Sequence, residues 1–353
     1  HVFRLAGDEF AVLQMGSAAP EGAKIVAQRI CRTIGEPFIV SGHRLLIGAS
    51  VGIASVDAET PDRVALLKAA DAALYLAKSE GRGTYRLFNA EINSALALRH
   101  QLEGELPEAI EAGQLELHYQ PKVRLDLGAR VAGYEALVRW RHPVRGMIPP
   151  SEFIPLAEET GLIVPLGEWV LMQACRDLAA SNSDATVAVN VSAVQFKRGT
   201  VVEAATRAIE ATGVRPEQLE IEITESMLMH NHAVTQEQLV GLRARGIHIA
   251  LDDFGTGYSS LSYLERYPID SVKIDRSFVA KLGTAPRAAA IVRAIVALAR
   301  EMDMVPVAEG VETADQADLL LALGCTMAQG YRFGKPEPAS VVLPKTETVA
   351  CVA

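Results

Sequence analysis

The chain has 353 residues, with 34 Lys or Arg and 43 Asp or Glu, which gives a net charge of −9 at neutral pH. This surplus of acid excludes the broad basic surface that holds a nucleic acid polymer. The apolar fraction of 49% is that of a folded globular protein, and the length predicts two or three domains. The first 90 residues carry 10 basic and 9 acidic side chains, so the surplus lies in the remainder.

The cysteines and the hydropathy pattern bear on the cellular compartment. Cys31, Cys175, Cys325 and Cys351 are scattered and form no Cys-x-x-Cys pair, which excludes a zinc ribbon and argues against a disulfide framework. No apolar run approaches the roughly 18–20 residues of a membrane span, and we expect no signal peptide within this sequence. We expect these domains to be cytoplasmic. Because the chain opens inside a strand without a methionine, we expect a fragment whose full-length parent can carry a membrane anchor.

Residues 1–90 predict a small α/β unit. Apolar runs at 2–5 and 10–13 flank Gly7-Asp8 and predict a β-hairpin. Helices are expected at 22–34 and 62–79, and strands at 37–40 and 44–54; Gly81 and Gly83 end the second helix. These strands are too few for a complete sheet, so we expect a truncated domain.

Residues 91–113 predict a helical connector, with Leu98, Leu102 and Leu106 at a spacing of four. From 114 to 345, short apolar strands alternate with helices, and 346–353 form a tail. Strands are expected at 115–120, 131–140, 187–191, 219–224, 247–251, 271–274, 305–308 and 325–328. Helices are expected at 150–160, 165–180, 201–212, 234–245, 259–267, 286–301 and 314–323. This alternation predicts an α/β fold with a (β/α)8 TIM-type barrel.

Polar residues stand at or near the ends of seven consecutive expected strands. They are Glu135, Asn190, Glu222 with Glu225, Asp252 with Asp253, Lys273 with Asp275, Glu309, and Gln329. One such charge alone is commonly just solvated at a loop, but strand ends of a TIM-type barrel converge on one mouth. Carboxylates gathered there need cations between them, and an all-oxygen ligand set suits Mg²⁺ or Mn²⁺. Two such ions about 3.5–4 Å apart clamp the attacking and leaving oxygens of a phosphoryl displacement.

The loop from Phe254 to Ser260 has the sequence Phe-Gly-Thr-Gly-Tyr-Ser-Ser and follows an expected strand. It fails as a dinucleotide fingerprint, because Ser260 stands where the third glycine is needed and two acids precede it. A Gly-Thr-Gly loop at a helix start can approach an anion or gate a site. An ordinary glycine turn with a Ser N-cap fits the local sequence equally well.

The segment Tyr134-Glu135-Ala136-Leu137-Val138-Arg139-Trp140 resembles the signature of the EAL family of bacterial phosphodiesterases. The resemblance covers about residues 100–345 and includes Gln120-Pro121, Asn190-Val191-Ser192, Glu222-Ile223-Thr224-Glu225, Asp252-Asp253-Phe254-Gly255, Lys273-Ile274-Asp275, Ala308-Glu309-Gly310 and Gln329-Gly330-Tyr331. It implies a TIM-type barrel with one antiparallel strand. It also implies hydrolysis of cyclic di-GMP to linear pGpG with two Mg²⁺ or Mn²⁺ ions.

The same resemblance implies roles for individual residues. The matching metal ligands are Glu135, Asn190, Glu222, Asp252, Asp253 and Glu309. Glu135, Asp253, Lys273, Glu309 and Gln329 form the implied catalytic set, in which Lys273 and Gln329 lie at the attacking water. Substrate contacts are implied for Gln120, Leu137, Arg139 and Gln329, with Arg139 on a phosphate. Glu225 is implied to anchor the loop 252–260.

The N-terminal segment resembles the C-terminal half of a GGDEF domain, a family that makes cyclic di-GMP from GTP. Its degenerate signature is Ala6-Gly7-Asp8-Glu9-Phe10. The methyl group of Ala6 replaces a glycine where backbone approaches the nucleotide. The half that supplies another metal-binding Asp and part of the GTP pocket lies outside this sequence. We therefore expect no diguanylate cyclase activity here, GTP binding only at the intact domain, and Asp8 and Glu9 as turn residues.

Together these features predict a metal-dependent cyclic di-GMP phosphodiesterase, and the family resemblance adds a homodimer through the EAL barrel. One alternative is a receptor that binds cyclic di-GMP without cleaving it. Another is a barrel phosphohydrolase that acts on a different substrate. Lys273, Asp253 and the complete loop favour the enzyme, because a receptor has no need of them.

Overall fold

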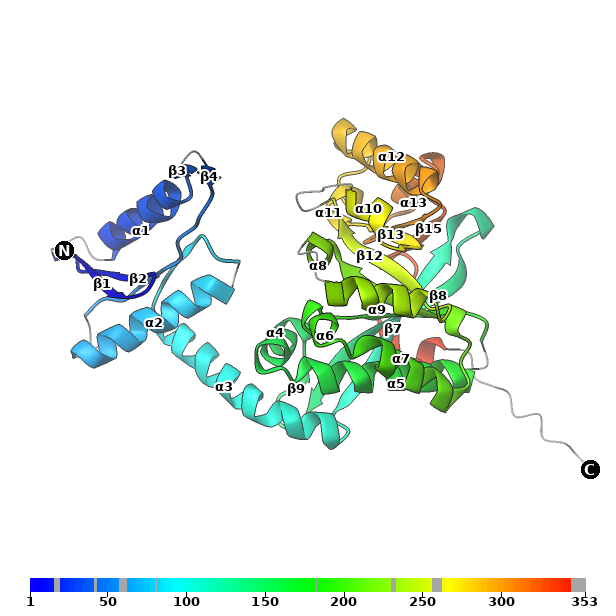
Figure 1. Cartoon of the computed structure of the whole chain (residues 1–353), viewed down its shortest axis with the longest axis horizontal. Coiled ribbons are helices and arrows are strands. Elements are labelled where there is room, and N and C mark those ends of the chain that lie inside the picture. Colours follow the sequence, from blue (N-terminus) through cyan, green and yellow to red (C-terminus); the bar gives the residue numbers. More distant parts are fainter. Residues whose placement is uncertain are drawn as a thin grey trace, which may run out of the picture. The chain divides into compact units, whose positions relative to one another are not determined.

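The computed structural model describes residues 1–15, 20–40, 43–56, 62–79, 81–181, 183–229, 233–255 and 262–343. The chain divides into two compact units, His1–Leu102 and Glu103–Ala353 (Figure 1). The expected tail at 346–353 lies outside the described residues. None of the described helices combines the length and the hydropathy needed to cross a membrane.

The described residues of the N-terminal unit form three separate two-stranded sheets, two helices and the first part of a third helix, α3 (Ala90–Glu111). The elements that precede α3 are β1 (Val2–Ala6), β2 (Glu9–Val12), α1 (Glu21–Ile34), β3 (Phe38–Val40), β4 (His43–Leu45), β5 (Val51–Ile53), α2 (Arg63–Ser79) and β6 (Tyr85–Leu87). The predicted hairpin is confirmed as the antiparallel pair β1–β2. Gly52 of β5 approaches the backbone of α2 at Ala70 and Leu74 so closely that a Cβ has no room.

The single strand predicted at 44–54 is wrong. The structure has two strands there, β4 antiparallel to β3 and β5 parallel to β6. Leu46 and Ile47 between them are exposed. The apolar run therefore turns from one partner to another, which strand periodicity alone does not reveal.

Helix α3 (Ala90–Glu111) occupies the predicted connector and spans the boundary between the two units. Leu102, Leu106 and Ala109 on one side of it are buried. Pro107 lies inside the helix.

The second unit is a closed eight-stranded barrel, as predicted. Its strands are β7 (Leu115–Arg124), β8 (Arg130–His142), β10 (Thr186–Asn190), β11 (Leu219–Thr224), β12 (His248–Phe254), β13 (Ser271–Ile274), β14 (Val305–Ala308) and β15 (Met327–Gln329). Strand order is β7-β15-β14-β13-β12-β11-β10-β8, and the β7–β8 pairing closes it. Strand β7 is antiparallel to both neighbours and the other barrel pairings are parallel, which confirms the implied antiparallel strand. The short strands β9 (Gly146–Ile148) and β16 (Glu337–Pro338) pair with β8 and β7.

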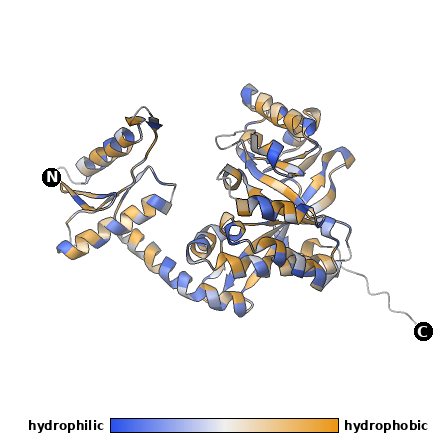
Figure 2. Cartoon of the chain, in the orientation of Figure 1, coloured by the Kyte–Doolittle hydropathy of each residue, from blue (hydrophilic) through white to orange (hydrophobic). Residues whose placement is uncertain are grey.

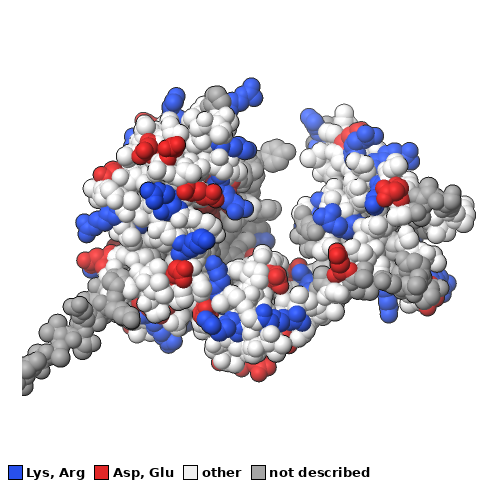
Figure 3. Space-filling model, turned by 180° about the vertical axis from the view of Figure 1, so that it is seen from behind, with Lys and Arg blue, Asp and Glu red and all other residues white. Residues whose placement is uncertain are grey.

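Helices cover the outside of the barrel (Figure 1). They are α4 (Pro150–Thr160), α5 (Ile163–Ser181), α6 (Ala193–Arg198), α7 (Val201–Thr212), α8 (Glu225–Met229), α9 (Ala233–Arg243), α10 (Ser262–Arg266), α11 (Arg276–Val279), α12 (Pro286–Glu301), α13 (Ala314–Ala322) and α14 (Ala339–Val342), with 3-10 turns at Leu125–Leu127 and Pro216–Gln218. These helices carry both hydrophobic and hydrophilic residues, as expected of elements with one face on the barrel (Figure 2). On the face seen in Figure 3, Lys and Arg side chains are interspersed with Asp and Glu.

Strands β7 and β8 continue past their pairings with the other barrel strands to the pair formed by Leu115 and Trp140, and the short strands β16 and β9 flank this extension. Trp140 is fully buried, packs edge-on against Phe153 of α4 with ring centroids 5.8 Å apart, and donates its indole N–H to Gln114. This extension places Glu135 in the middle of a 13-residue strand and not at its end.

Candidate active site

All eight barrel strands contribute a polar side chain to one cluster. Gln120 (β7), Glu135 (β8), Asn190 (β10), Glu222 (β11), Asp252 (β12), Lys273 (β13), Glu309 (directly after β14) and Gln329 (β15) form it. At its centre, the Nζ atom of Lys273 lies 2.6 Å from Oε2 of Glu222 and 2.7 Å from Oε1 of Glu309. Oδ1 of Asp252 is 3.2 Å from the same Nζ atom, and Oε2 of Glu135 is 3.8 Å from it. Residues more than 170 positions apart in the sequence thus share one ammonium group.

Amide side chains hold the carboxylate of Glu135. Asn190 donates to Oε1 of Glu135 over 2.6 Å, and Gln329 donates to Oε2 over 2.6 Å. Gln329 also donates to the Gln120 side chain over 2.9 Å, and Gln120 donates to the carbonyl of Gly334. The orientation of Glu135 is therefore fixed from both sides.

An irregular backbone positions Asp252 and Asp253. The register of β12 on β13 shifts between Leu251 and Phe254, and Asp253 adopts a φ of +56°. Such a left-handed conformation is uncommon for a residue with a side chain. Together with the register shift, it takes the Asp253 side chain out of the regular alternation of side chains between the two faces of the strand. As a result Asp252, Asp253 and Glu309 each offer a carboxylate oxygen, and these oxygens lie within 4.8 Å of one another.

Two charged residues of the barrel interior were not predicted. Lys122 of β7 is buried and forms an ion pair with Glu220 of β11, and its Nζ atom lies 3.6 Å from Oε1 of Glu222. A signal for both was present in the sequence. Side chains two residues apart on a strand share a face, so Lys122 follows Gln120 and Glu220 precedes Glu222 on the interior side.

Burial and mutual charge shift the protonation of the cluster. Burial raises the pKa of Glu222 to about 8 and that of Glu309 to about 7, with Lys273 opposing the shift and neighbouring carboxylates adding to it. For Glu135, burial acts in the same direction, but Lys273 and the two amide donors outweigh it and lower the pKa. Burial acts to lower the pKa of Lys273, and the surrounding carboxylates raise it well above its usual value. Lys273 is therefore an ammonium in this arrangement.

The other residues predicted from the sequence lie outside this cluster of polar side chains. Arg139 and Leu137 lie on β8 and are half-buried, and Arg139 donates to the carbonyl of Val138. Glu225 is buried and accepts a hydrogen bond of 3.1 Å from the backbone N–H of Gly255, at the start of the predicted loop. The rest of that loop, residues 256–260, lies outside the described residues. Asp275 caps α11 by accepting from the N–H of Ser277.

In the N-terminal unit, the signature residues Ala6, Gly7, Asp8, Glu9 and Phe10 are all exposed. Gly7 and Asp8 form the turn between β1 and β2, which confirms Asp8 as a turn residue. The expectation for Glu9 is wrong, because Glu9 begins β2 and pairs with Ala6 of β1. Gly7 has a φ of +48°, and its carbonyl accepts two hydrogen bonds from the Arg4 guanidinium.

The cluster fits divalent cations. Oε1 of Glu222 is buried and, within the described part of the chain, has no hydrogen-bond partner. A buried carboxylate oxygen that accepts no hydrogen bond is costly unless a cation or water contacts it, and the Nζ atom of Lys122 lies 3.6 Å away, beyond hydrogen-bond distance. The surrounding donors are carboxylate and amide oxygens, the ligand type that Mg²⁺ and Mn²⁺ prefer.

The raised pKa values predict how metal binding depends on pH. A carboxyl with a folded-state pKa above the value of about 4.3 in the unfolded chain favours folding at low pH, and this stabilisation is lost as the pH rises through its folded-state pKa. In metal-free protein, the free energy of unfolding contributed by Glu222 and Glu309 thus falls progressively as the pH rises from about 4 to about 8. Since protons compete with cations, the increase in melting temperature caused by Mn²⁺ should be larger at pH 8.5 than at pH 6. An equal shift at both pH values would contradict this.

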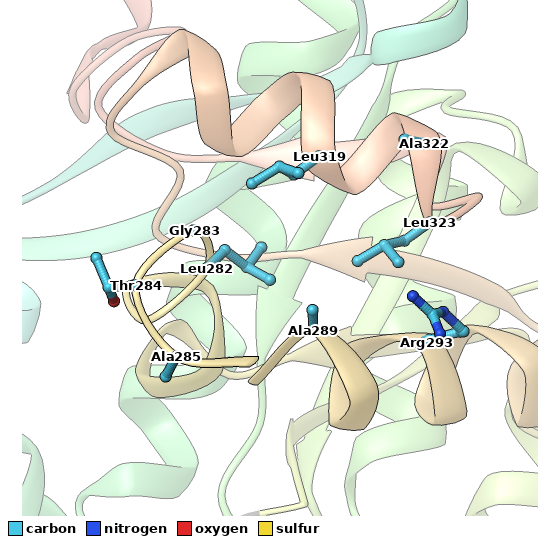
Figure 4. Close-up of a pocket in the computed structure, with 9 residues that line it drawn as sticks. All are labelled: Leu282, Gly283, Thr284, Ala285, Ala289, Arg293, Leu319, Ala322 and Leu323. Atoms are coloured by element: carbon cyan, nitrogen blue, oxygen red, sulfur yellow. The ribbon is translucent and has the colours of Figure 1, made fainter. Parts of the chain in front are cut away.

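A surface pocket of about 470 Å³ lies between α13 on one side and, on the other, the first half of α12 with residues 282–285 that precede it (Figure 4). Leu282, Leu319 and Leu323 give it an apolar lining, and Arg293 stands at one side. Of the described residues that line it, none belongs to the cluster of eight polar side chains around Lys273.

Comparisons with known proteins agree with this geometry. The family model for the EAL domain matches residues 103–336, and that for the diguanylate cyclase GGDEF domain matches residues 1–84. The chain is 44% identical over 346 residues to the bifunctional diguanylate cyclase/cyclic di-GMP phosphodiesterase MucR of Pseudomonas aeruginosa. It is 39% identical over 339 residues to the cyclic di-GMP phosphodiesterase PdeR of Escherichia coli. These alignments cover 97% and 95% of the chain but only 50% and 51% of the two relatives.

Solved structures show the same fold. A c-di-GMP complex of the PaMucR phosphodiesterase superposes with a TM-score of 0.65 at 46% identity, covering 68% of this chain and 98% of that one. The EAL domain of Mycobacterium smegmatis DcpA superposes with a TM-score of 0.55 at 40% identity, covering 64% and 94%. With its barrel, its strand-end cluster and these matches, the chain belongs to the EAL domain family and carries a GGDEF-family segment ahead of the EAL domain.

Proposed function

We propose that the barrel hydrolyses cyclic di-GMP to linear pGpG with the help of divalent cations. The main support is the meeting of Glu135, Glu222, Asp252 and Glu309 around one ammonium group, with a buried oxygen on Glu222 that accepts no hydrogen bond in the described structure. The descriptions of MucR and PdeR as cyclic di-GMP phosphodiesterases support the choice of substrate.

The proposed metal ligands divide into two groups. Glu135, Asn190, Glu222 and Asp252 would hold one ion, and Asp253 and Glu309 would serve the second. We propose Mg²⁺ or Mn²⁺, because every donor is an oxygen. Cations bound there offset the negative charge of the phosphodiester and lower the pKa of the attacking water.

Lys273 and the amides then orient the reactants. The Lys273 ammonium carries three donors, which face Glu222, Glu309 and Asp252. With Glu309 and Asp252 engaged by cations, one donor would be released for the attacking water while another stays on Glu222. Because its pKa is raised, Lys273 keeps its proton and acts as a hydrogen-bond donor and not as the base. The water oxygen forms a bond to phosphorus and the bond from phosphorus to the 3′ oxygen breaks. One proton of the water ends on the 3′ oxygen, which leaves as the 3′ hydroxyl of pGpG, and the other is released to solvent from the new 5′ phosphate.

Arg139 is proposed to bind a substrate phosphate, because its planar guanidinium matches two phosphate oxygens. Arg139→Ala should raise KM for cyclic di-GMP about 10-fold or more, an effect of at least about 1.4 kcal/mol. kcat should change less, because the described contacts of Arg139 include none with Lys273 or its surrounding carboxylates. Steady-state kinetics at saturating Mn²⁺ measure both values. A fall in kcat with KM unchanged would contradict a role in binding.

The experiment that tests the function is incubation of this chain with cyclic di-GMP and Mn²⁺ or Mg²⁺, followed by chromatography of the nucleotides. Appearance of pGpG, abolished by a chelator, is the expected result. Tight binding of cyclic di-GMP without pGpG would favour a receptor instead. Cleavage of other cyclic nucleotides in preference to cyclic di-GMP would favour a different phosphohydrolase. A parallel incubation with GTP should yield no cyclic di-GMP.

We further propose that the protein is a homodimer through the EAL barrel, as the family resemblance implies. Sedimentation velocity should give about twice the chain mass. A monomer with full phosphodiesterase activity would contradict a functional dimer.

A further inference from the structure

The barrel interior contains a second buried cation, Lys122, that the proposed mechanism does not use. Only 4% of its side chain is exposed, and its Nζ atom forms an ion pair with Oε1 of Glu220. The other carboxylate oxygen of Glu220 accepts a hydrogen bond of 3.3 Å from Ser271. Both oxygens of Glu220 are thereby engaged, and the position of Lys122 is fixed.

Strand geometry places this ion pair one layer of side chains deeper in the barrel than the proposed metal ligands. Glu220 precedes Glu222 by two residues on β11, and Ser271 precedes Lys273 by two residues on β13. Because β7 runs antiparallel, Lys122 lies below Gln120 although it follows it in sequence. Side chains in such layers of a barrel are mostly apolar. Burying a Lys–Glu pair there costs desolvation energy that the pair recovers only partly, so stability alone does not account for it.

Glu222 links the two layers. Its Oε1 atom lies 3.6 Å from Nζ of Lys122, and its Oε2 atom lies 2.6 Å from Nζ of Lys273. The Glu222 carboxylate is fully buried, and it is held between two ammonium groups that come from β7 and β13. Without Lys122, the Oε1 atom of this carboxylate would lose an ammonium group 3.6 Å away.

We propose that Lys122 is a positioning residue for the reaction, because its ammonium, held by Glu220, fixes the orientation in which Glu222 meets a divalent cation. This inference builds on the proposed phosphodiesterase function. Outer partners that orient a metal ligand typically contribute 10–100-fold to metal affinity or activity. Lys122 acts through Glu222 and does not itself touch the substrate.

The test compares Mn²⁺ affinity among variants, measured from the electron paramagnetic resonance signal of free Mn²⁺. Lys122→Met leaves Glu220 as a buried unpaired carboxylate, so the decisive variant is the double replacement Lys122→Met/Glu220→Gln, which removes both charges. Arg243→Met is the matched control, because it removes an ion pair with Asp270 elsewhere on the barrel, with 3.0 Å between Nη2 and Oδ1. Lys122→Arg is a further variant that keeps a charge for Glu220 but replaces the compact ammonium with a planar fork.

The double variant should bind Mn²⁺ about 10-fold more weakly than the unmodified chain, whereas Arg243→Met should bind it equally well. Hydrolysis by the double variant should need correspondingly more Mn²⁺ and recover at saturating Mn²⁺, with KM for cyclic di-GMP unchanged. If the double variant does not fold, Lys122→Arg should show the weakened Mn²⁺ affinity. Wild-type Mn²⁺ affinity in whichever of these variants folds would overturn the inference. Absence of hydrolysis by the unmodified chain would refute the proposed function only, since the Mn²⁺ comparison does not depend on turnover.

Discussion

Replacing Glu135 with Ala should lower kcat for cyclic di-GMP by about 10³-fold, which corresponds to about 4 kcal/mol of transition-state stabilisation. Glu135 is buried, is held by Asn190 and Gln329, and lies 3.8 Å from the ammonium of Lys273. Its loss removes a proposed metal ligand and leaves two amide donors without their acceptor. Single-turnover kinetics at saturating Mn²⁺ measure the chemical step directly.

The matched control is Arg141→Ala on the same strand. Arg141 is exposed and pairs with Glu116, an interaction of the kind that contributes at most about 1 kcal/mol. This variant should keep wild-type turnover. Hydrolysis by a folded Glu135→Ala variant at a rate near that of the Arg141→Ala control would show that the site assignment is wrong.

Replacing Lys273 with Met should lower the free energy of unfolding of metal-free protein by about 3–5 kcal/mol. The ammonium lies within 3.2 Å of oxygens of Glu222, Glu309 and Asp252, so its loss leaves buried carboxylates without this cation. The loss of stability should be greater at pH 8 than at pH 6, because protonation of the carboxyls relieves their repulsion. Urea denaturation at the two pH values measures it.

Divalent cations provide the internal control for this variant. If Lys273 supplies the positive charge that balances the buried carboxylates, Mn²⁺ should stabilise Lys273→Met more than it stabilises the unmodified chain. Turnover should remain low even at saturating Mn²⁺, since the proposed donor to the attacking water is missing. Equal stability of the two metal-free proteins at pH 8 would refute the charge-balancing role.

Much of the barrel was predictable because its elements are local patterns. Short, mainly apolar runs of four to six residues marked β11, β13 and β14 at their observed bounds, and amphipathic spacing marked α4, α7 and α12. Polar residues that interrupt or end these runs identified Glu222, Asp252 and Lys273. Their type, all oxygen donors plus one lysine, indicated divalent cations and phosphoryl chemistry before any coordinates were known.

Other features depend on contacts between distant segments. The sequence contains no local sign that β7 is antiparallel to both neighbours, because strand direction is set by pairing. The family resemblance alone had implied it. The apolar run at 44–54 divides because β4 and β5 have different partners. The left-handed conformation of Asp253 and the register shift beside it also depend on the neighbouring strand β13.

The amino-acid sequence by itself determined the order of strands and helices, the chemical type of the site and the family, because these follow from periodicity and motif spacing along the chain. Only the tertiary structure decided that Lys122 and Glu220 form a pair beneath Glu222, and that four carboxylates share the ammonium of Lys273. The physical reason is that closing the barrel brings together side chains far apart in sequence. Their charges and protonation then depend on burial and on one another.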